Sequence, residues 1–210
     1  MNIQEVFDNN VVKYEAWYKD HPYVFQSELE LIRESLPLGE ILGIEVGLGT
    51  GRFSKELGIK EGVEPSLMMR KKAISRGIHV FDAVAERLPF KDMKFDFVLM
   101  INCIIYFEQM LPAFLEAKRV LKKGGCILIG FIDKDSTIGR YYVANKSTST
   151  FYKQSHFYSV DQVKNEIVNA GFSALEIKQT LFGSLDDIKT FQSSREGYGK
   201  GSFVLIKAFK

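Results

Sequence analysis

Three glycines at alternate positions, Gly47, Gly49 and Gly51, restrict the fold of this chain more than any other feature. They follow an apolar run at residues 41–46, and a stretch that favours a helix begins at Arg52. Because glycine lacks a Cβ, the backbone can turn sharply there and come close to a ligand. The order predicts a strand, a ligand-binding loop and a helix, although a plain strand-to-helix turn can also use such glycines.

Short apolar runs alternate with stretches that favour helices. A first helix is predicted at residues 22–36, where apolar side chains have helical spacing as far as Pro37. The alternation predicts a parallel sheet with helices on both faces. The apolar runs that we expect to form its strands are residues 41–46, 62–63, 78–81, 97–101 and 126–132.

The last third of the chain has a different order. Residues 160–170 favour a helix that ends at Gly171, and residues 174–180 and 203–209 read as strands. A loop rather than a helix joins these two strands, so we expect an antiparallel edge. Residues 133–156 are the least regular segment, and we expect them to form a lid or a substrate insertion.

A carboxylate stands at the end of the second predicted strand. Glu64 follows Val63 at the carboxyl edge of the sheet, where open α/β folds bind their ligands. A carboxylate there can accept hydrogen bonds from both hydroxyls of a ribose. The alternative is an exposed acid in a loop.

Length and composition narrow the class of protein. A chain of 210 residues with 46% hydrophobic residues fits one domain, and no apolar run approaches the roughly 20 residues that span a bilayer. The first residues lack the pattern of a secretory signal, so we expect a cytoplasmic protein. Cys103 and Cys126 are too few for a disulfide framework or a four-cysteine zinc site, and no metal site is expected. A net charge of +2 does not indicate nucleic-acid binding.

Several segments in order resemble the motifs of a known family. Residues 45–51, Glu64, and residues 85–90, 95–101 and 121–125 resemble the successive motifs of class I S-adenosylmethionine-dependent methyltransferases, most closely the small-molecule methyltransferase-type domain. The resemblance implies a Rossmann-like α/β fold, with a mostly parallel seven-stranded sheet, helices on both faces and one antiparallel edge strand. We expect a single domain over residues 1–210. Its parts would be a helical cap at 1–38, a cofactor-binding core at 39–132, the insertion at 133–156, and a C-terminal helix with antiparallel strands at 157–210.

The resemblance implies that S-adenosylmethionine is bound and that its methyl group goes to a small-molecule acceptor. Glu45 would orient the loop and the methionine amino group, the backbone of residues 47–51 would lie against the methionine, and Glu64 would hold the ribose. The family often has Asp or Thr where this chain has Val84, so a side-chain hydrogen bond to the adenine amine would need Asp82. The other residues expected at the cofactor are Pro65, Ser66, Met68, Ala85, Glu86, Asn102 and Cys103.

Methyl transfer from a sulfonium is an in-line displacement with a good leaving group, so alignment of donor and acceptor can supply much of the catalysis. If the acceptor must lose a proton, His21 and His156 are candidates because imidazole titrates near neutral pH. Tyr106 is a third candidate. Each histidine has the alternative of a surface position.

Aromatic residues are expected around the acceptor. They could surround a methyl-accepting or cationic group, or could pack an N-terminal helix instead. Residues 102–106 lack the paired prolines with which related families grip a nucleobase, which argues against DNA methylation. The candidates for this pocket are Tyr14, Trp17, Tyr18, Tyr106 and Tyr141, with Tyr142 beside the last of them.

Two other functions compete with methyl transfer. A nicotinamide dehydrogenase also uses a glycine loop and an acid at a strand end, but its third glycine falls where this chain has Arg52. A non-catalytic regulatory domain could keep the S-adenosylmethionine site and use the bound cofactor for folding or control. Turnover with any acceptor would exclude it.

Overall fold

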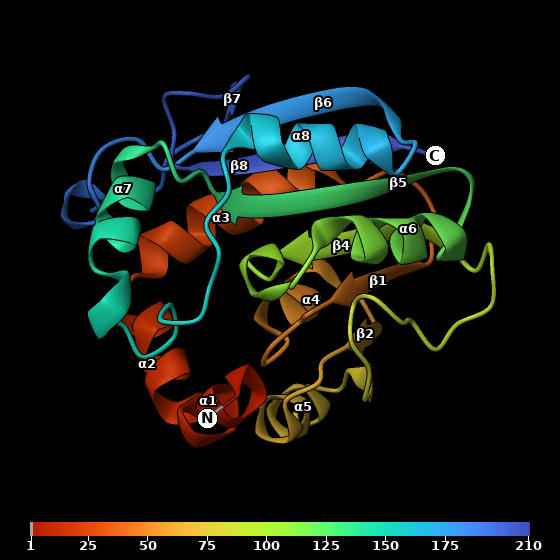
Figure 1. The fold of residues 1–210 in the computed structure, drawn as a ribbon, viewed down its shortest axis with the longest axis horizontal. Helices are drawn as coiled ribbons and strands as arrows, with labels where there is room; N and C mark the ends of the chain where they lie inside the picture. Colours follow the sequence, from red (N-terminus) through yellow and green to blue (C-terminus); the bar gives the residue numbers. More distant parts are fainter. Residues whose placement is uncertain (1) are drawn as a thin grey trace.

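The computed structural model describes residues 2–210, and its centre is an eight-stranded sheet with the order β3-β2-β1-β4-β5-β8-β6-β7 (Figure 1). The strands from β3 to β5 in this order pair parallel. β8 runs antiparallel to β5 and β6, and β7 runs antiparallel to β6. The strands are β1 (Gly43–Val46), β2 (Glu61–Val63), β3 (His79–Phe81), β4 (Phe95–Ile101), β5 (Leu121–Ile132), β6 (Ser173–Thr180), β7 (Arg195–Glu196) and β8 (Phe203–Phe209).

The α/β class, the mostly parallel sheet and its antiparallel edge are confirmed. The predicted number of seven strands is wrong, because β7 is an additional strand of two residues. Its pairing with Lys178 and Gln179 of β6 is too short to leave a periodic pattern in the sequence. The antiparallel edge therefore contains two reversed strands, β8 and β7.

Helices cover both faces of the sheet. Figure 1 shows α6 and α8 on one face, with α3 and α4 on the other. Among the described residues, none of the helices has the length and apolar content needed to cross a membrane. The α-helices are α1 (Ile3–Asn9), α2 (Val11–Asp20), α3 (Pro22–Ser35), α4 (Arg52–Leu57), α5 (Leu67–Ile74), α6 (Met110–Val120), α7 (Thr137–Ala144) and α8 (Val160–Asn169), and the short 3₁₀ turns are η1 (Ile104–Tyr106), η2 (Lys146–Thr148) and η3 (Leu185–Asp187).

The central strand β4 is buried on both sides. Val98 and Met100 belong to the hydrophobic cluster shared with α6 and α8, whereas Phe97 and Leu99 belong to the cluster shared with α3. Successive side chains of a strand point to opposite faces, so a strand between two helical layers needs apolar residues at every position. This explains the unbroken apolar run at residues 97–101.

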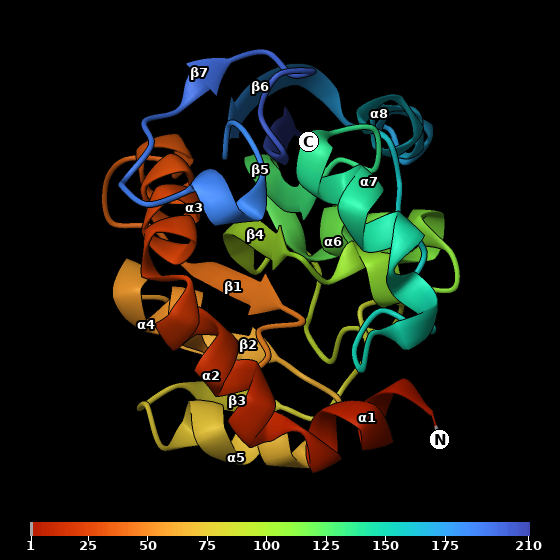
Figure 2. The same cartoon turned by 90° about the vertical axis from the view of Figure 1, so that its left-hand side faces the viewer.

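The expectation that residues 133–156 are irregular is corrected by helix α7 and the turn η2 within them. Ser136 caps α7 by accepting a hydrogen bond from the backbone N–H of Gly139 at 3.0 Å. In Figures 1 and 2, α7 lies above α1 and α2, and all three helices lie beyond the ends of β1 and β4. The segment thus faces the N-terminal helices across the ends of the central strands.

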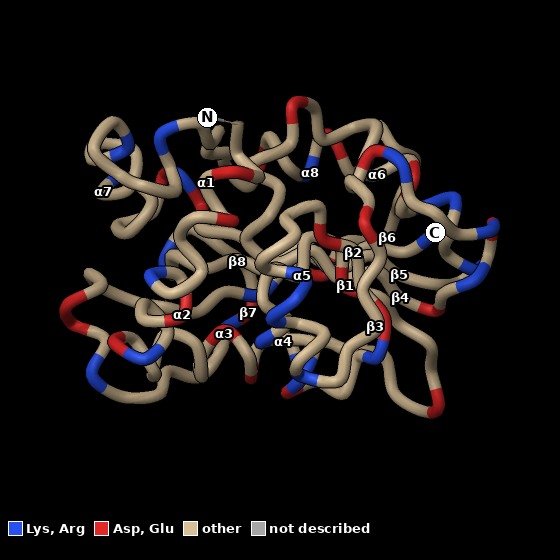
Figure 3. Tube along the Cα trace, turned by 90° about the horizontal axis from the view of Figure 1, so that it is seen from below, with Lys and Arg blue, Asp and Glu red and all other residues tan. Residues whose placement is uncertain are grey.

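An ion-pair cluster fixes α2 to the glycine loop, to the start of α4 and to the turn after α5. Basic residues gather along α4 and α5 (blue in Figure 3), and Glu15 of α2 pairs with Arg52 at 2.7 Å and with Arg76 at 2.6 Å. The hydroxyl of Thr50 also donates to Glu15 at 2.6 Å. Burial alone would raise the pKa of Glu15, but the hydrogen bonds from Arg76, Thr50 and Arg52 outweigh it and lower the pKa to about 2.

We predict that Glu15→Gln destabilises the protein by about 1.5–3 kcal/mol at pH 7, because hydrogen bonds to a charged, partly buried group are lost. Folding lowers the pKa of Glu15, so its contribution is complete above the ordinary value of 4.5 and is lost as the pH falls towards 2. Urea unfolding of both proteins at pH 7, 5 and 4 measures the difference, which should narrow below about pH 4.5.

The matched control is Glu30→Gln. Glu30 forms an exposed pair with Arg33 inside α3, so this variant should lose about 0–1 kcal/mol. Equal losses in the two variants at pH 7 would contradict the assignment of Glu15 as the anchor of α2.

Candidate functional site

One cavity of about 580 Å³ opens at the carboxyl ends of β1, β2 and β4. Its wall includes the loops that follow these strands and residues 83–86, and it continues across α1, α2, α3, α7 and residues 148–152. The volume lies in the usual range of small-molecule sites, which is roughly 300–1,000 Å³. One cavity therefore contains both sets of predicted residues. These are the loops expected to bind a cofactor and the aromatic residues expected around an acceptor.

The glycine loop lies against the cavity. Gly47 has a φ of 71°, and a Cβ at this position would lie 2.6 Å from the Cβ of Cys103. Gly49 has a φ of 56° and would bring a Cβ to 3.1 Å from the Tyr14 hydroxyl. Gly51 is outside the cavity wall and instead permits close packing against Ile78.

Glu64 closes the loop from the neighbouring strand. The N–H of Gly49 donates to its Oε2 and the N–H of Ser66 donates to its Oε1, both at 2.8 Å. Burial raises the pKa of Glu64 to about 7, although these two backbone hydrogen bonds act against the rise. Each carboxylate oxygen can accept a second hydrogen bond, so the group is able to receive ribose hydroxyls.

An acid that the sequence reasoning missed connects α1 to the same region. Asp8 accepts hydrogen bonds from the Ser66 hydroxyl at 2.6 Å and from the Met68 N–H at 2.9 Å. The Met68 side chain is 43% exposed and lies outside the cavity wall, whereas Met69 is 1% exposed and forms part of the wall, as does Pro65. The methionine at the cavity is thus one position later than expected.

Residues 83–86 form the next part of the wall, and Val84, Ala85 and Glu86 are all in it. Asp82 is not, because it turns outward and pairs with Arg70 at 2.8 Å. The polar group that the sequence reasoning required beside Val84 is therefore not supplied by Asp82.

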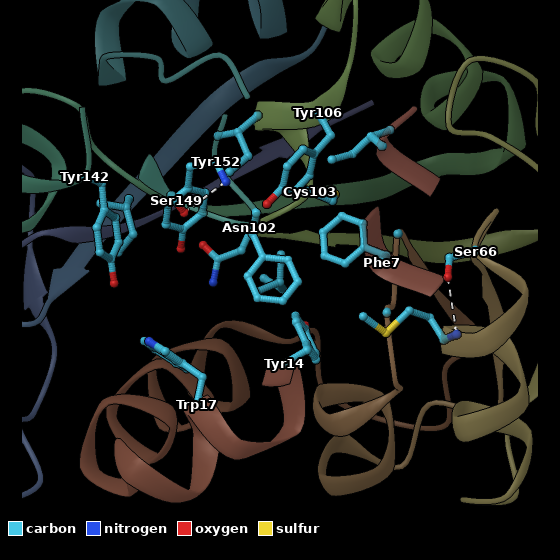
Figure 4. A pocket seen from close by; sticks show the side chains of 18 of the residues that line it. Phe7, Tyr14, Trp17, Ser66, Asn102, Cys103, Tyr106, Tyr142, Ser149 and Tyr152 are labelled. Carbon is cyan, nitrogen blue, oxygen red and sulfur yellow. Dashed lines mark hydrogen bonds between the residues drawn. The ribbon is translucent and has the colours of Figure 1, made fainter. Parts of the chain in front are cut away.

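Asn102 and Cys103 turn the chain into the cavity at the end of β4. Asn102 has a φ of 53°, in the left-handed region that Asn adopts more readily than most residues. The Cys103 thiol donates to the carbonyl of Val46 at 3.3 Å, and burial raises its pKa well above the ordinary value. Figure 4 shows the Asn102 side chain in the middle of the cavity, with Cys103 and Ser66 to one side and Trp17 and Tyr142 to the other.

The aromatic half of the cavity contains all of the expected acceptor residues, Tyr14, Trp17, Tyr18, Tyr106, Tyr141 and Tyr142. Phe7, Phe151 and Tyr152 were not expected, and their rings join the same group. Phe7 of α1 lies 5.2 Å from Tyr106 and 5.4 Å from Phe151 between ring centroids, and Tyr142 lies 4.9 Å from Tyr152. They come from segments without a periodic pattern, so only the tertiary fold brings them together.

Of the three candidate proton acceptors, only Tyr106 lies in the cavity wall. His21 stacks on Trp17 and its Nδ1 is 2.8 Å from the Trp17 carbonyl, and His156 is exposed. Neither histidine is in the cavity wall. Tyr106 is in the wall, and burial raises the pKa of its hydroxyl well above 10.

Two buried glutamates complete the site. Glu45 is outside the wall and accepts a hydrogen bond from the Ser54 hydroxyl of α4, and burial raises its pKa to about 7. Glu28 of α3, which the sequence reasoning missed, is in the wall and is 2% exposed. The sequence did contain a sign of this residue. Glu28 lies between Val24 and Leu31 on the buried face of α3, where a carboxylate interrupts an apolar pattern.

Comparison with known proteins agrees with this geometry. A methyltransferase-domain family model matches residues 44–129. A crystal structure from Thermotoga maritima, described as a SAM-dependent methyltransferase and possible histamine N-methyltransferase, is 41% identical with a TM-score of 0.95, covering 98% of this chain and 99% of that one. An uncharacterised protein of Methanocaldococcus jannaschii is 42% identical over 205 residues, 98% of both chains.

A more distant structure shares the fold. A methyltransferase from Mesorhizobium loti is 20% identical, with a TM-score of 0.66 over 88% of this chain and 98% of that one.

These relationships exclude the dehydrogenase alternative. The cavity fits S-adenosylmethionine as the cofactor. It contains the backbone of Gly47 and Gly49, where a Cβ would have little room, and the buried carboxylate of Glu64. With 41% identity along nearly its whole length to a protein of that kind, the chain belongs to the class I S-adenosylmethionine-dependent methyltransferases.

Proposed function

We propose that this enzyme methylates a small molecule held in the aromatic half of the cavity. The observation that carries the proposal is that one enclosure contains both the glycine loop with Glu64 and the aromatic residues of α1, α2, α7 and residues 148–152. An acceptor bound there is separated from solvent by the N-terminal helices. The description of the Thermotoga relative, which names a small amine, also supports an acceptor of this size.

The cofactor half of the cavity suggests a role for each group. Glu64 would accept the ribose hydroxyls, and Gly47 and Gly49 would lie against the methionine portion of the cofactor. Met69 and residues 84–86 would border the adenine, with Val84 giving an apolar contact. When bound, the cofactor supplies a methyl group on a positively charged sulfur.

The other residues would act by placement and by exclusion of water. Asn102 stands between the two halves of the cavity, where its amide can orient an acceptor (Figure 4). The aromatic rings remove water from the acceptor and restrict its position, and such alignment can supply much of the barrier reduction in a displacement. Residues 1–38 and 133–156 would then be the parts of the chain that select the acceptor.

We predict that Glu64→Gln weakens the binding of S-adenosylhomocysteine about 10- to 100-fold, because charge-assisted hydrogen bonds worth about 1.5–3 kcal/mol are lost. Isothermal titration calorimetry measures the effect, with NADH as a ligand that should not bind. Glu61→Gln is the matched control, since Glu61 stands at the start of β2, pairs with Lys94 and lies outside the cavity wall. Binding of NADH, or equal affinity in both variants, would contradict the assigned cofactor site.

We predict that Trp17→Ala lowers kcat/KM for the acceptor by about tenfold or more while the affinity for S-adenosylhomocysteine stays unchanged, because a buried aromatic contact of about 1–2 kcal/mol is removed. The acceptor is first found by screening small amines, phenols and thiols for methyl transfer from radiolabelled cofactor.

Tyr23→Ala is the control for that variant, because Tyr23 is an exposed residue of α3 outside the cavity wall. A Trp17 variant with full activity, or one that loses cofactor affinity instead, would show that this half of the cavity does not hold the acceptor.

A further inference from the structure

Glu28 has a carboxylate oxygen that lacks a hydrogen-bond partner within residues 2–210. Its side chain lies in the cavity wall, its exposed fraction is 2%, and the unpartnered atom is Oε2. It is the one buried side-chain oxygen or nitrogen of the described chain in this condition. Buried polar atoms without a partner are rare in folded proteins because each one costs desolvation energy, so a ligand is a natural partner for Oε2.

The surroundings of Glu28 contain dipoles but no compensating charge. The side chain of Asn102 acts on the carboxyl as a hydrogen-bond donor, and no Lys or Arg of the described residues contributes to its electrostatics. Tyr18, Tyr142 and Tyr152 line the same cavity as Glu28, and the negative charge of Glu28 contributes to the raised pKa of each of their hydroxyls. The part of the cavity wall that the structure describes contains one cationic side chain, Lys13, which donates to the Thr150 hydroxyl at 2.6 Å and not to Glu28. A carboxylate without a counter-ion among aromatic residues is complementary to a cation.

Two other acids of the same chain show how a structural carboxylate is paired here. Glu15 is paired with Arg52 and Arg76. Glu64 has a backbone N–H on each oxygen. Glu28 has neither arrangement, although the neighbouring Ser27 on α3 is fully engaged with the Tyr23 carbonyl and the Gln192 N–H. The missing partner is thus local to the cavity and is not a general feature of the protein.

We propose that the methyl acceptor is a small amine, and that Glu28, with Asn102 and the tyrosines of the cavity wall, binds its protonated nitrogen. The Glu28 carboxylate would then take up the ammonium proton, and the freed lone pair would form the N–C bond as the S–C bond of the sulfonium breaks and S-adenosylhomocysteine leaves. This rests on the proposed function, because it assigns the aromatic half of the cavity to the acceptor. The nitrogen would gain a counter-ion and aromatic faces, and Oε2 would gain its partner. Because Asn102 reaches Glu28 and also borders Cys103, the nitrogen is held at the boundary between the two halves of the cavity.

The ionisation of Glu28 is consistent with a ligand of opposite charge. Burial raises the pKa of Glu28 to about 8, and the Asn102 side chain acts against the rise. A cation bound beside the carboxyl would favour its ionised form, as opposite charges at close range do. The protein thus keeps an acid that a positively charged ligand can ionise.

The experiment compares amines with their uncharged isosteres on the protein saturated with S-adenosylhomocysteine. The probes are 2-phenylethylamine, histamine and tyramine, each paired with the corresponding alcohol, and calorimetry at pH 8.5 measures their affinities. We expect at least one amine to bind ten times or more tightly than its alcohol. We expect Glu28→Gln to remove this preference while the affinity for S-adenosylhomocysteine stays within twofold.

Glu30→Gln, an exposed change on the same helix, is the control and should keep the preference. Amines that bind no better than alcohols in the unmodified protein would overturn the proposal, and this comparison needs no variant to fold. A Glu28→Gln protein that keeps the preference would overturn it as well. Methylation of a phenol or a thiol with no effect of Glu28→Gln would leave the proposed function standing and remove only the amine.

Discussion

The close approach of two neighbouring strand ends is the constraint on which the site depends. β1 and β4 pair in parallel, with Glu45 opposite Leu99, so both strands end at the same edge of the sheet. Gly47 and Cys103 meet there, and a Cβ on Gly47 would lie only 2.6 Å from the Cβ of Cys103. Since no side chain fits at this point, backbone forms this part of the cavity floor. The shape of the glycine loop is therefore a consequence of strand order together with one glycine.

The N-terminal helices convert this open sheet edge into an enclosure. Asp8 connects α1 to the start of α5, and Glu15 connects α2 to Arg52 and Arg76. The Tyr14 hydroxyl lies over Gly49 as a result. Both acids act between elements far apart in the sequence, so the wall of the cavity and the stability of the cap depend on the same contacts.

The sequence predicts the parts of the fold that follow from a local pattern. It does not predict which way a side chain points around a helix axis, or which distant segments pack together. Gly47, Gly49 and Glu64 stand at strand ends, so their positions at the cavity follow from topology. Met68 was expected there and Met69 is found, because a change of one position on a helix turns a side chain by about 100°. The strand β7 has only two residues and leaves no periodic signal.

Three buried glutamates show why partners matter more than burial in assigning a role. Burial raises the pKa of Glu28, Glu45 and Glu64 alike. Glu45 is satisfied by Ser54 under the loop, and Glu64 is oriented by two N–H groups that leave its outer lone pairs available. Glu28 has one oxygen, Oε2, that accepts no hydrogen bond from the described residues. Because the same fold gives Glu45 and Glu64 their hydrogen bonds, we assign the partner of Glu28 Oε2 to a group of the bound acceptor.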